Sequence, residues 1–400
     1  MSSSEKINAI RDLMPVTQHA AYLNTGSVGA MSTITVEALH AANQRELLEG
    51  RATNASLSAS RLAAAEVRQR FANMVQASPD TIALTHHTTD GMNIALCGLQ
   101  WQPGDEIVTT DLEHPGGLLP VYVQKRFGVT VKIVSLPAEL SPEDIVARFE
   151  AAITPRTRLL AFSHVAWSTG VCLPLAEIVA MAHGQHVLCA VDAAQAAGAI
   201  ALDLPASGVD FYAMPGQKWL CGPEGTGALY VRPDRVSLLT PTFVGFRSLG
   251  EDGDYNFSGD WLPASTARRY EVGTMYRPGL QAIATNMAWL EETVGRDWIY
   301  SRIIELAAYA RNALAQVAGI RVITPPGPHA GLVTFTLDGY EPPRVNAKLA
   351  EDNIVIRYLT SPAAVRVSTH FYNTEADIDR LVTALKAILA SDPESLPAYP

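Results

Sequence analysis

The chain of 400 residues is poor in clustered positive charge, in long apolar runs and in cysteine. Its formal net charge is −10 and no run of lysine and arginine occurs, which argues against nucleic acids and anionic membranes as partners. No segment approaches the roughly 18 uninterrupted apolar residues of a membrane span. The first residues, MSSSEK, lack the apolar core of a signal peptide.

The few cysteines are scattered, without the spacing of a disulfide framework or a metal site. We therefore expect reduced, mostly buried thiols in a cytoplasmic protein. His86 and His87 are neighbours in the chain, and neighbouring side chains rarely point at one ion, so we expect no metal site. The four cysteines are Cys97, Cys172, Cys189 and Cys221.

The chain is instead rich in apolar residues, with 48% hydrophobic and only 18% charged residues, which is enough for a large core in two domains. Short β-branched runs alternate with segments of helical period, such as 142–153 and 174–183. This pattern is typical of a mainly parallel sheet covered by helices on both faces. Strands are predicted at 81–85, 106–110, 130–135, 157–163, 187–192, 209–214 and 226–231.

From about residue 275 the pattern changes. A long helical stretch over 275–318 precedes four short strands and an amphipathic helix over 374–390. The segment 247–267 is rich in Gly, Asp, Ser and Pro and predicts a long loop. We therefore predict an α/β fold with an N-terminal arm that returns to the site (1–30), a large domain with a mainly parallel seven-stranded sheet (31–285) and a small C-terminal α+β domain (286–400). The small-domain strands are predicted at 320–324, 330–337, 354–358 and 364–369.

One lysine, Lys218, lies between glycines and aromatic residues in a mostly apolar stretch, and Asp192 and Gln195 follow an earlier apolar run. This combination indicates an enzyme that holds pyridoxal 5'-phosphate (PLP) as a Schiff base on the lysine, with the aspartate on the pyridinium nitrogen. Gln195 is then placed to donate to the phenolic oxygen of the ring. The alternatives are a snorkelling Lys218 and an Asp192 that caps a helix over 194–199.

Further polar residues follow predicted strands, where ligands bind in parallel α/β sheets. Thr88 and Thr89 open a helix, whose free amides suit a phosphate, although an ordinary helix cap is the alternative. His114 is placed to stack on a flat cofactor ring or to move protons, or else it caps a backbone group. Trp167 forms either a wall of the substrate pocket or part of the core.

In the predicted small domain, Arg366 lies in an apolar strand and needs an anion, which a substrate carboxylate would supply. Arg357 is the competing candidate, and an internal salt bridge is the alternative interpretation. Thr274 is a candidate phosphate ligand that reaches the cofactor of a neighbouring subunit, with a routine helix cap as its alternative.

As a set, these residues resemble the class V aminotransferase family of fold type I PLP enzymes, from about residue 22 to residue 390. The resemblance implies the roles given above for Lys218, Asp192 and Gln195, with His114 stacked on the ring. It also implies a homodimer with shared active sites, in which Thr89 and the partner chain's counterpart of Thr274 lie near the phosphate. The matching segments are 22–26 (YLNTG), Thr88-Thr89, Glu113-His114, Asp192-x-x-Gln195, Lys218 with Gly222-Pro223 and Gly225, Glu271-x-Gly273-Thr274, and Arg366.

The resemblance also suggests which residues meet an amino-acid substrate. Arg366 would bind its carboxylate, and Asn24 and Trp167 would line its site. The family often has Ser or Thr at the position of Pro215 and His at that of Gln217, so here only Gln217 would donate to the phosphate.

Within the family, the chain is similar to the branch of cystine C–S lyases and isopenicillin N epimerases. The similarity lies in segments 113–116 (EHPG), 163–165 (SHV), 169–170 (TG), 173–175 (LPL) and 371–375 (FYNTE). Cysteine desulfurases carry a cysteine on a loop before the carboxylate arginine, but the corresponding loop, 357–365, has none. This argues against desulfurase chemistry through a mobile thiol.

The predicted reaction is deprotonation at Cα by the Lys218 amine, followed by β-elimination from cystine, an S-conjugated cysteine or a cysteine sulfoxide, with pyruvate and ammonia as further products. Epimerisation and transamination begin with the same carbanion and stay open, as does a decarboxylating variant. A non-catalytic family member is the alternative from another class, motivated by Pro215 and Gln217.

Overall fold

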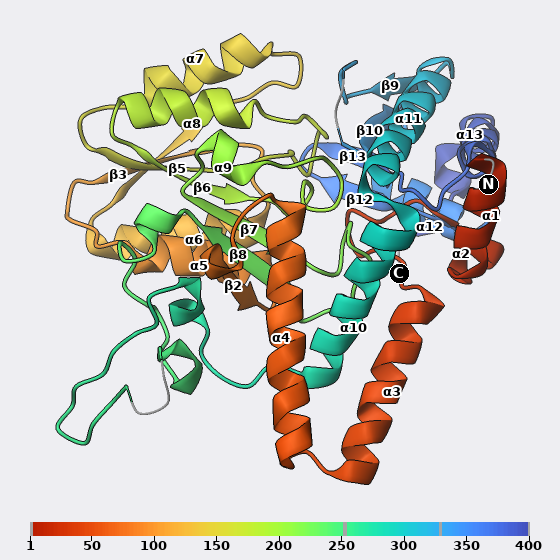
Figure 1. The fold of residues 1–400 in the computed structure, drawn as a ribbon. Helices are drawn as coiled ribbons and strands as arrows, with labels where there is room; N and C mark the ends of the chain where they lie inside the picture. Colours follow the sequence, from red (N-terminus) through yellow and green to blue (C-terminus); the bar gives the residue numbers. More distant parts are fainter. Residues whose placement is uncertain (1–2, 251–253, 328–329, 399–400) are drawn as a thin grey trace.

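A seven-stranded sheet forms the centre of the larger part of the molecule (Figure 1). The structure is a computed structural model and describes residues 3–250, 254–327 and 330–398. The strand order is β2-β8-β7-β6-β5-β3-β4, and all neighbours are parallel except the two that β8 makes with β2 and β7. The predicted mainly parallel α/β sheet is therefore confirmed. Its strands are β2 (Ile82–Thr85), β3 (Glu106–Thr110), β4 (Thr130–Val134), β5 (Thr157–Ser163), β6 (Leu188–Asp192), β7 (Phe211–Pro215) and β8 (Gly227–Val231).

Alternate residues of the strands enter cores on opposite faces of this sheet. In β5, Leu160 and Phe162 belong to one core, and Leu159 and Ala161 belong to the other. Because both faces are buried, the strands are continuous apolar runs in the sequence. Figure 1 shows α7 and α8 on one face and α5 and α6 on the other. The helices are α5 (Thr88–Gly98), α6 (Pro115–Val123), α7 (Pro142–Ala152), α8 (Leu175–Gly184) and the short α9 (Leu204–Ser207).

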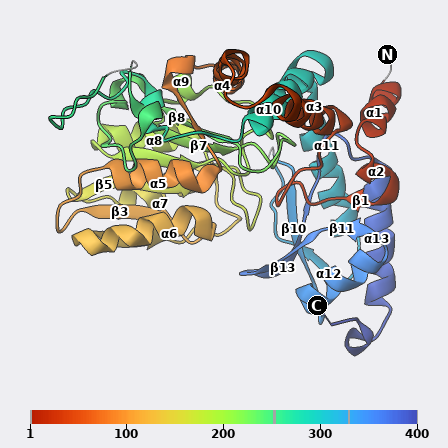
Figure 2. The ribbon, with the colours of Figure 1, turned by 90° about the horizontal axis from the view of Figure 1, so that it is seen from below.

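The C-terminal part has a four-stranded antiparallel sheet of order β12-β13-β10-β9 and its own apolar core. Its helices pack beside this sheet (Figure 2). It agrees with the predicted α+β architecture. Its elements are α11 (Arg296–Ala315), β9 (Ile320–Val322), β10 (Leu332–Leu337), α12 (Pro342–Glu351), β11 (Ile354–Val355), β12 (Arg357–Thr360), β13 (Ala363–Ser368) and α13 (Glu375–Leu389).

The N-terminal arm joins this C-terminal part. After α1 (Ser3–Asp12) and α2 (Val16–His19), the short strand β1 (Ala21–Tyr22) pairs in parallel with β11. Arg11 holds the arm further, because its guanidinium lies 2.9 Å from the Asp377 carboxylate. The chain then passes toward the seven-stranded sheet, which places residues 24–29 between the two parts.

Three local predictions are wrong. The helical stretch 275–318 is broken into α10 (Arg277–Ala288), a π-helical turn and α11, because Gly295 adopts a φ of +86°. The segment 194–199 forms turns and no helix. The predicted strand 354–358 is split into β11 and β12, and the expected loop 357–365 is a hairpin of β12 and β13.

The predicted boundaries at residues 30 and 285 stay a prediction. Helix α10 crosses the second of them and packs on α3 (Thr33–Glu49) and α4 (Asn54–Met74). The predicted loop 247–267 is largely without helix or strand and extends away from the sheet (Figure 1), with 251–253 outside the described residues. Among the helices described, none is both long and apolar enough to cross a membrane.

Candidate active site

The carboxyl end of β6 presents a buried carboxylate. Asp192 is 5% exposed, and its Oδ1 accepts a hydrogen bond from the Ala194 amide at 2.8 Å. Burial raises the pKa of Asp192, and the Ala194 amide and the Lys218 ammonium only partly oppose this. Its second oxygen makes no hydrogen bond to any described residue, although a Cβ on Gly117 would lie 3.0 Å from it. The predicted alternative, a cap on a helix over 194–199, is wrong, since Asp192 caps only a turn.

Lys218 lies on the turn between β7 and β8. Within the described ranges its Nζ makes no hydrogen bond and no ion pair. A snorkelling lysine would carry its ammonium out to solvent or to a surface carboxylate, and no such carboxylate among the described residues pairs with Lys218. Burial lowers its pKa to about 8, with Asp192 opposing the shift and Arg366 adding to it. The turn is packed tightly, because a Cβ on Gly29 would lie only 2.1 Å from the Lys218 carbonyl oxygen. The backbone of Lys218 is therefore fixed by packing, and its amine, with its lowered pKa, lies close enough to Asp192 for the two charges to interact.

Gln195 is buried between the arm and the Lys218 turn. Its Nε2 donates to the Gly26 carbonyl at 2.9 Å, and its Oε1 accepts from the Trp219 indole at 2.9 Å. An amide nitrogen carries two hydrogens, so one N–H of Gln195 remains for another acceptor. This matches what the predicted bond to the phenolic oxygen of PLP requires.

His114 precedes α6 and contacts Trp167. The two rings meet edge to face, with centroids 5.1 Å apart and planes at 89°. The Nδ1 of His114 accepts a hydrogen bond from the Gly116 amide at 3.0 Å, so His114 does cap a backbone group, as the alternative predicted. Because Nδ1 is an acceptor, the neutral ring carries its proton on Nε2. Burial, Lys218 and two arginines lower the pKa of His114 to about 4, which makes the ring neutral at neutral pH.

Arg366 is 2% exposed on β13. It donates to the Trp167 carbonyl at 2.8 Å and to Ser27 Oγ at 3.3 Å, while its Nε has no partner. No carboxylate among the described residues lies within ion-pair distance of this guanidinium, so the internal salt bridge predicted as the alternative is wrong. Burial, and then Arg357, lowers the pKa of Arg366 to about 9. A buried cation without an anion is poised for an anionic ligand.

Asn24 supports Arg366 indirectly. Its Oδ1 accepts the Ser27 hydroxyl at 2.7 Å, and the same Ser27 oxygen accepts from Arg366. Asn24 therefore orients the arm beside the arginine. A contact of Asn24 itself with substrate stays a prediction.

The predicted phosphate ligands Thr88, Thr89 and Gln217 differ in their contacts. Thr88 and Gln217 each have a buried side-chain oxygen without a hydrogen-bond partner among the described residues. Thr89 packs against the start of α6, where a Cβ on Gly116 would lie 2.6 Å from its Oγ1. The residue that caps α5 is His87, so the alternative that Thr88 or Thr89 caps this helix is wrong.

Thr274 lies elsewhere. It is exposed and lines a cavity of about 720 Å³ next to β2 and α5. Lys218, Asp192, Gln195 and Arg366 do not line this cavity. Thr274 is thus not part of the cluster in its own chain, and its predicted contact with the cofactor of a neighbouring subunit stays a prediction. Other residues that line the cavity include Thr85, His86, Asp90, Phe243 and Val272.

Three residues around the site had no role in the sequence predictions. Glu113 is buried and accepts hydrogen bonds from Thr110 and from both the amide and the hydroxyl of Ser163, and burial raises its pKa to about 7. Its position shortly after the predicted strand 106–110, next to His114, is the signal that the sequence offers. Ser27 and Trp219 offered none, because their contacts depend on how distant segments meet.

The cluster fits PLP on its own chemistry. A cofactor with a phosphate, a pyridinium nitrogen and a phenolic oxygen needs an amine, an acid and several donors, and the cluster supplies an unpaired amine, a carboxylate with a free oxygen and a free amide N–H. Unsatisfied buried polar atoms in a native protein call for such a partner.

Comparison with known proteins agrees with this fit. Residues 30–381 match the family Aminotransferase class-V. The chain is 32% identical over 398 residues to the isopenicillin N epimerase of Amycolatopsis lactamdurans, covering 92% of this chain and 94% of that protein. It is 31% identical over 342 residues to the cysteine desulfurase CsdA of Escherichia coli, covering 80% and 82%.

Two solved structures are similar over nearly the whole chain. A complex of the cystine C–S lyase C-DES with its reaction product cysteine persulfide has a TM-score of 0.88 and 32% identity, covering 93% of this chain and 99% of that chain. A lysine-to-alanine mutant of C-DES with glycine covalently linked to the PLP cofactor has a TM-score of 0.89 and 32% identity, covering 94% and 98%. The chain therefore belongs to the class V aminotransferase family and is a PLP-dependent enzyme of that family.

Proposed function

We propose that this protein is a C–S lyase that cleaves cystine by β-elimination. The observation that carries the proposal is the pair of arginines at the site. Arg357 and Arg366 are direct partners in the antiparallel hairpin of β12 and β13, so their side chains leave the same face. Both lower the pKa of His114, which means that both act on one site.

Two like charges opposite each other destabilise a hairpin unless anions lie between them. Arg366 is buried without a carboxylate, and Arg357 is exposed and forms no ion pair within the described part of the chain. A substrate with two carboxylates would satisfy both cations. Of the predicted substrates, cystine has this form, with one carboxylate for Arg366 and a distal one for Arg357.

The cysteines support loss of sulfur on a substrate fragment instead of capture by the enzyme. The hairpin of β12 and β13 has no cysteine where desulfurases carry theirs, and Ser361 and Pro362 alone join its strands. Burial raises the pKa of Cys172 to about 11 and raises that of Cys221 further. Thiols that stay protonated are poor sulfur acceptors.

The residues of the site would divide the reaction among them. Lys218 would hold PLP before substrate binds, and the cofactor would supply an electron sink for the pair left at Cα of the substrate. Arg366 orients the substrate carboxylate, and the Lys218 amine, with its lowered pKa, takes the Cα proton once the substrate has displaced it. Asp192 would stabilise positive charge on the pyridinium nitrogen, and His114, which is neutral because its pKa is lowered, would stack on the cofactor ring without adding charge.

Epimerisation is the second candidate, because an epimerase whose substrate has a second carboxylate would use the same two arginines. The test is a product assay in D₂O with PLP-loaded protein, cystine, S-conjugated cysteines and ordinary amino acids, read by mass spectrometry. Pyruvate with cysteine persulfide from cystine is the expected result. Deuterium at Cα without fragmentation, or a keto acid that retains its side chain, would reject the lyase in favour of the epimerase or an aminotransferase.

We also infer that the chain acts as a homodimer in the cytoplasm. The segment that follows β8 exposes apolar side chains beside the cavity of Thr274, and exposed apolar surface of this kind marks interaction sites. A second copy on this face would bring Thr274 toward the partner's phosphate. The exposed side chains include Phe243 (71%), Phe246 (63%) and Leu262 (65%).

A further inference from the structure

Trp219, the residue after Lys218, connects three parts of the site. Its indole Nε1 donates to Gln195 Oε1 at 2.9 Å. Its backbone carbonyl accepts from His370 Nε2 at 2.8 Å. The side chain is 1% exposed. The indole therefore lies between the residue predicted to contact the ring oxygen of PLP and the segment that follows the Arg366 strand.

Packing fixes the direction of the indole N–H. A Cβ on Gly331 would lie 2.6 Å from two atoms of the six-membered ring, so a glycine is required where β10 begins to approach Trp219. The His370 ring packs against the indole with centroids 5.4 Å apart. His370 is itself oriented, because its Nδ1 accepts the Phe371 amide at 2.9 Å and leaves Nε2 as the donor. An indole held on both sides in this way cannot turn its N–H elsewhere.

An indole N–H only donates. The amide of Gln195 must therefore present its oxygen to Trp219, which turns its nitrogen toward the Gly26 carbonyl, 2.9 Å away. If the amide were flipped, its NH₂ would face the indole N–H and its oxygen would face a carbonyl, and both contacts would be lost. The orientation of Gln195 is set by these two neighbours, and its remaining N–H is the one left for the cofactor.

We propose that Trp219 is a positioning residue, whose indole N–H fixes the Gln195 amide so that an N–H, and not a lone pair, meets the phenolic oxygen of PLP. The inference rests on the placement of Lys218, Asp192 and Gln195 around PLP in the proposed function, and it is independent of which substrate is cleaved. A donor on that oxygen draws electron density from it and weakens its hold on the proton shared with the lysine linkage. Loss of the donor should therefore raise the pH at which this proton leaves.

The test compares Trp219→Phe with Trp289→Phe, each loaded with PLP. Trp289 is a matched control, because it is also buried (6% exposed), packs against Phe371 and has no side-chain hydrogen bond in the described part of the chain. The visible absorption band is titrated with pH, and PLP affinity is measured by dialysis. For Trp219→Phe we expect the midpoint to rise by about half a unit and PLP to bind roughly five-fold more weakly, the effect of one buried hydrogen bond. Trp289→Phe should keep the wild-type midpoint.

A double variant makes the test specific. In a Gln195→Met background, Trp219→Phe should produce no further rise in the midpoint, because the oriented N–H is already absent. An unchanged midpoint in Trp219→Phe, or an equal rise in Trp289→Phe, would overturn the inference. If Trp219→Phe does not fold, Gln195→Met alone must raise the midpoint, and its failure to do so would also overturn it. These measurements need no substrate. If Trp219→Phe shifts the midpoint but the wild-type protein does not cleave cystine, the proposed lyase function is rejected and the role of Trp219 is kept.

Discussion

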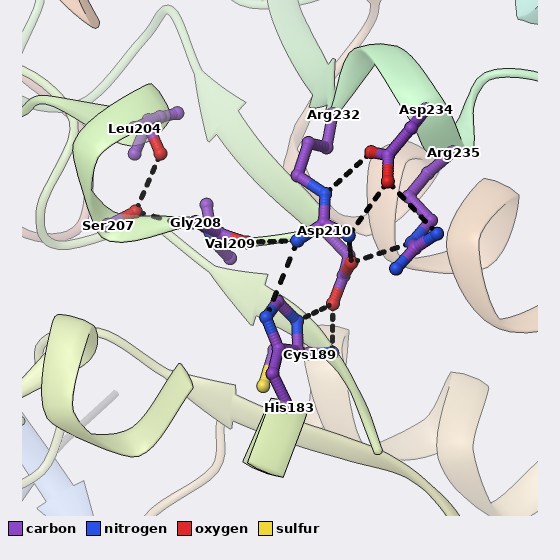
Figure 3. Close-up of polar contacts among 10 residues, drawn as sticks. All are labelled: His183, Cys189, Leu204, Ser207, Gly208, Val209, Asp210, Arg232, Asp234 and Arg235. Atoms are coloured by element: carbon purple, nitrogen blue, oxygen red, sulfur yellow. Dashed lines mark hydrogen bonds and ion pairs between the residues drawn. The ribbon is translucent and has the colours of Figure 1, made fainter. Parts of the chain in front are cut away.

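Two buried aspartates lie at opposite ends of the neighbouring parallel strands β6 and β7, and their surroundings differ. Asp210, just before β7, is fully buried and lies within 3.3 Å of atoms from Arg232, Arg235 and His183, with the Cys189 amide at 2.9 Å (Figure 3). The carboxylate of Asp192, at the end of the adjacent strand β6, has a single hydrogen bond to the described residues, from the Ala194 amide.

The comparison separates a carboxylate that holds the fold from one that is available to a ligand. The arginines around Asp210 are themselves anchored, since Arg232 also donates to the Gly208 carbonyl and to Asp234 (Figure 3). No such compensation surrounds Asp192, and burial raises its pKa. Burying a charge that the chain does not neutralise lowers the stability of the fold. Ionisable groups with such strongly shifted pKa values are typical of functional sites.

The largest effect is expected at Lys218, whose positive charge acts on Asp192. Lys218→Ala should lower the rate of cystine cleavage at least about a thousand-fold, because the amine serves as both cofactor anchor and base. The apoenzyme should keep its melting temperature, since Lys218 makes no ion pair within the residues described. Pyruvate release measures the loss of cleavage, and thermal melting of the apoenzyme measures whether stability is kept. Cleavage at the wild-type rate would contradict the assignment.

Exchanging each aspartate for asparagine tests the contrast directly. Asp210→Asn should reduce the free energy of unfolding by about 3 kcal/mol, because it removes a fully buried carboxylate that two partly buried arginines share. Asp192→Asn should leave the stability of the apoenzyme unchanged or slightly raised, and should slow Cα–H exchange strongly. Urea denaturation measures the free energy of unfolding of each variant, and deuterium incorporation at Cα measures the rate of exchange. Equal destabilisation by the two changes would remove the distinction.

A third carboxylate, Glu113, lies between these extremes, because it accepts three hydrogen bonds but has no cation within ion-pair distance among the residues that the structure describes. Its folded pKa of about 7 lies above the usual value of 4.5. A raised carboxyl pKa means that stability is greatest while the group is protonated and falls as pH rises from about 4.5 to 7, by up to roughly 3 kcal/mol. In Glu113→Gln this fall between pH 4.5 and 7 should be smaller, as measured by urea denaturation at each pH. An unchanged pH profile would show that folding does not raise the pKa of Glu113.

The smallest effect is expected at Arg357, the exposed cation. Arg357→Ala should raise KM for cystine about ten-fold, the loss of one partly exposed charge pair. A substrate with one carboxylate, such as an S-alkyl cysteine, should show little change and serves as the control. Arg366→Ala should raise KM for both. If Arg357→Ala affects both substrates equally, the arginine does not recognise a distal carboxylate.

Much of this arrangement follows from the sequence for a simple reason. The strands are buried on both faces, so they stand out as apolar runs, and Lys218, Asp192 and Arg366 stand out as single charges within such runs. Trp219 was not distinguishable from a core aromatic, because its role depends on the rotation of one side chain toward Gln195. The break at Gly295 was hidden because helical period continues on both sides of it.

The pairing of β1 with β11 has a consequence for how the enzyme is made. The arm contributes Gly26 and Ser27 to the site, and the strand that anchors it lies more than 300 residues later in the chain. The site thus combines the arm with strands β11 and β13, which lie far from it in the chain. Gly26 and Ser27 reach their places at the site only when β1 has paired with β11, so we expect capture of the cofactor to depend on closure of the arm onto the C-terminal part.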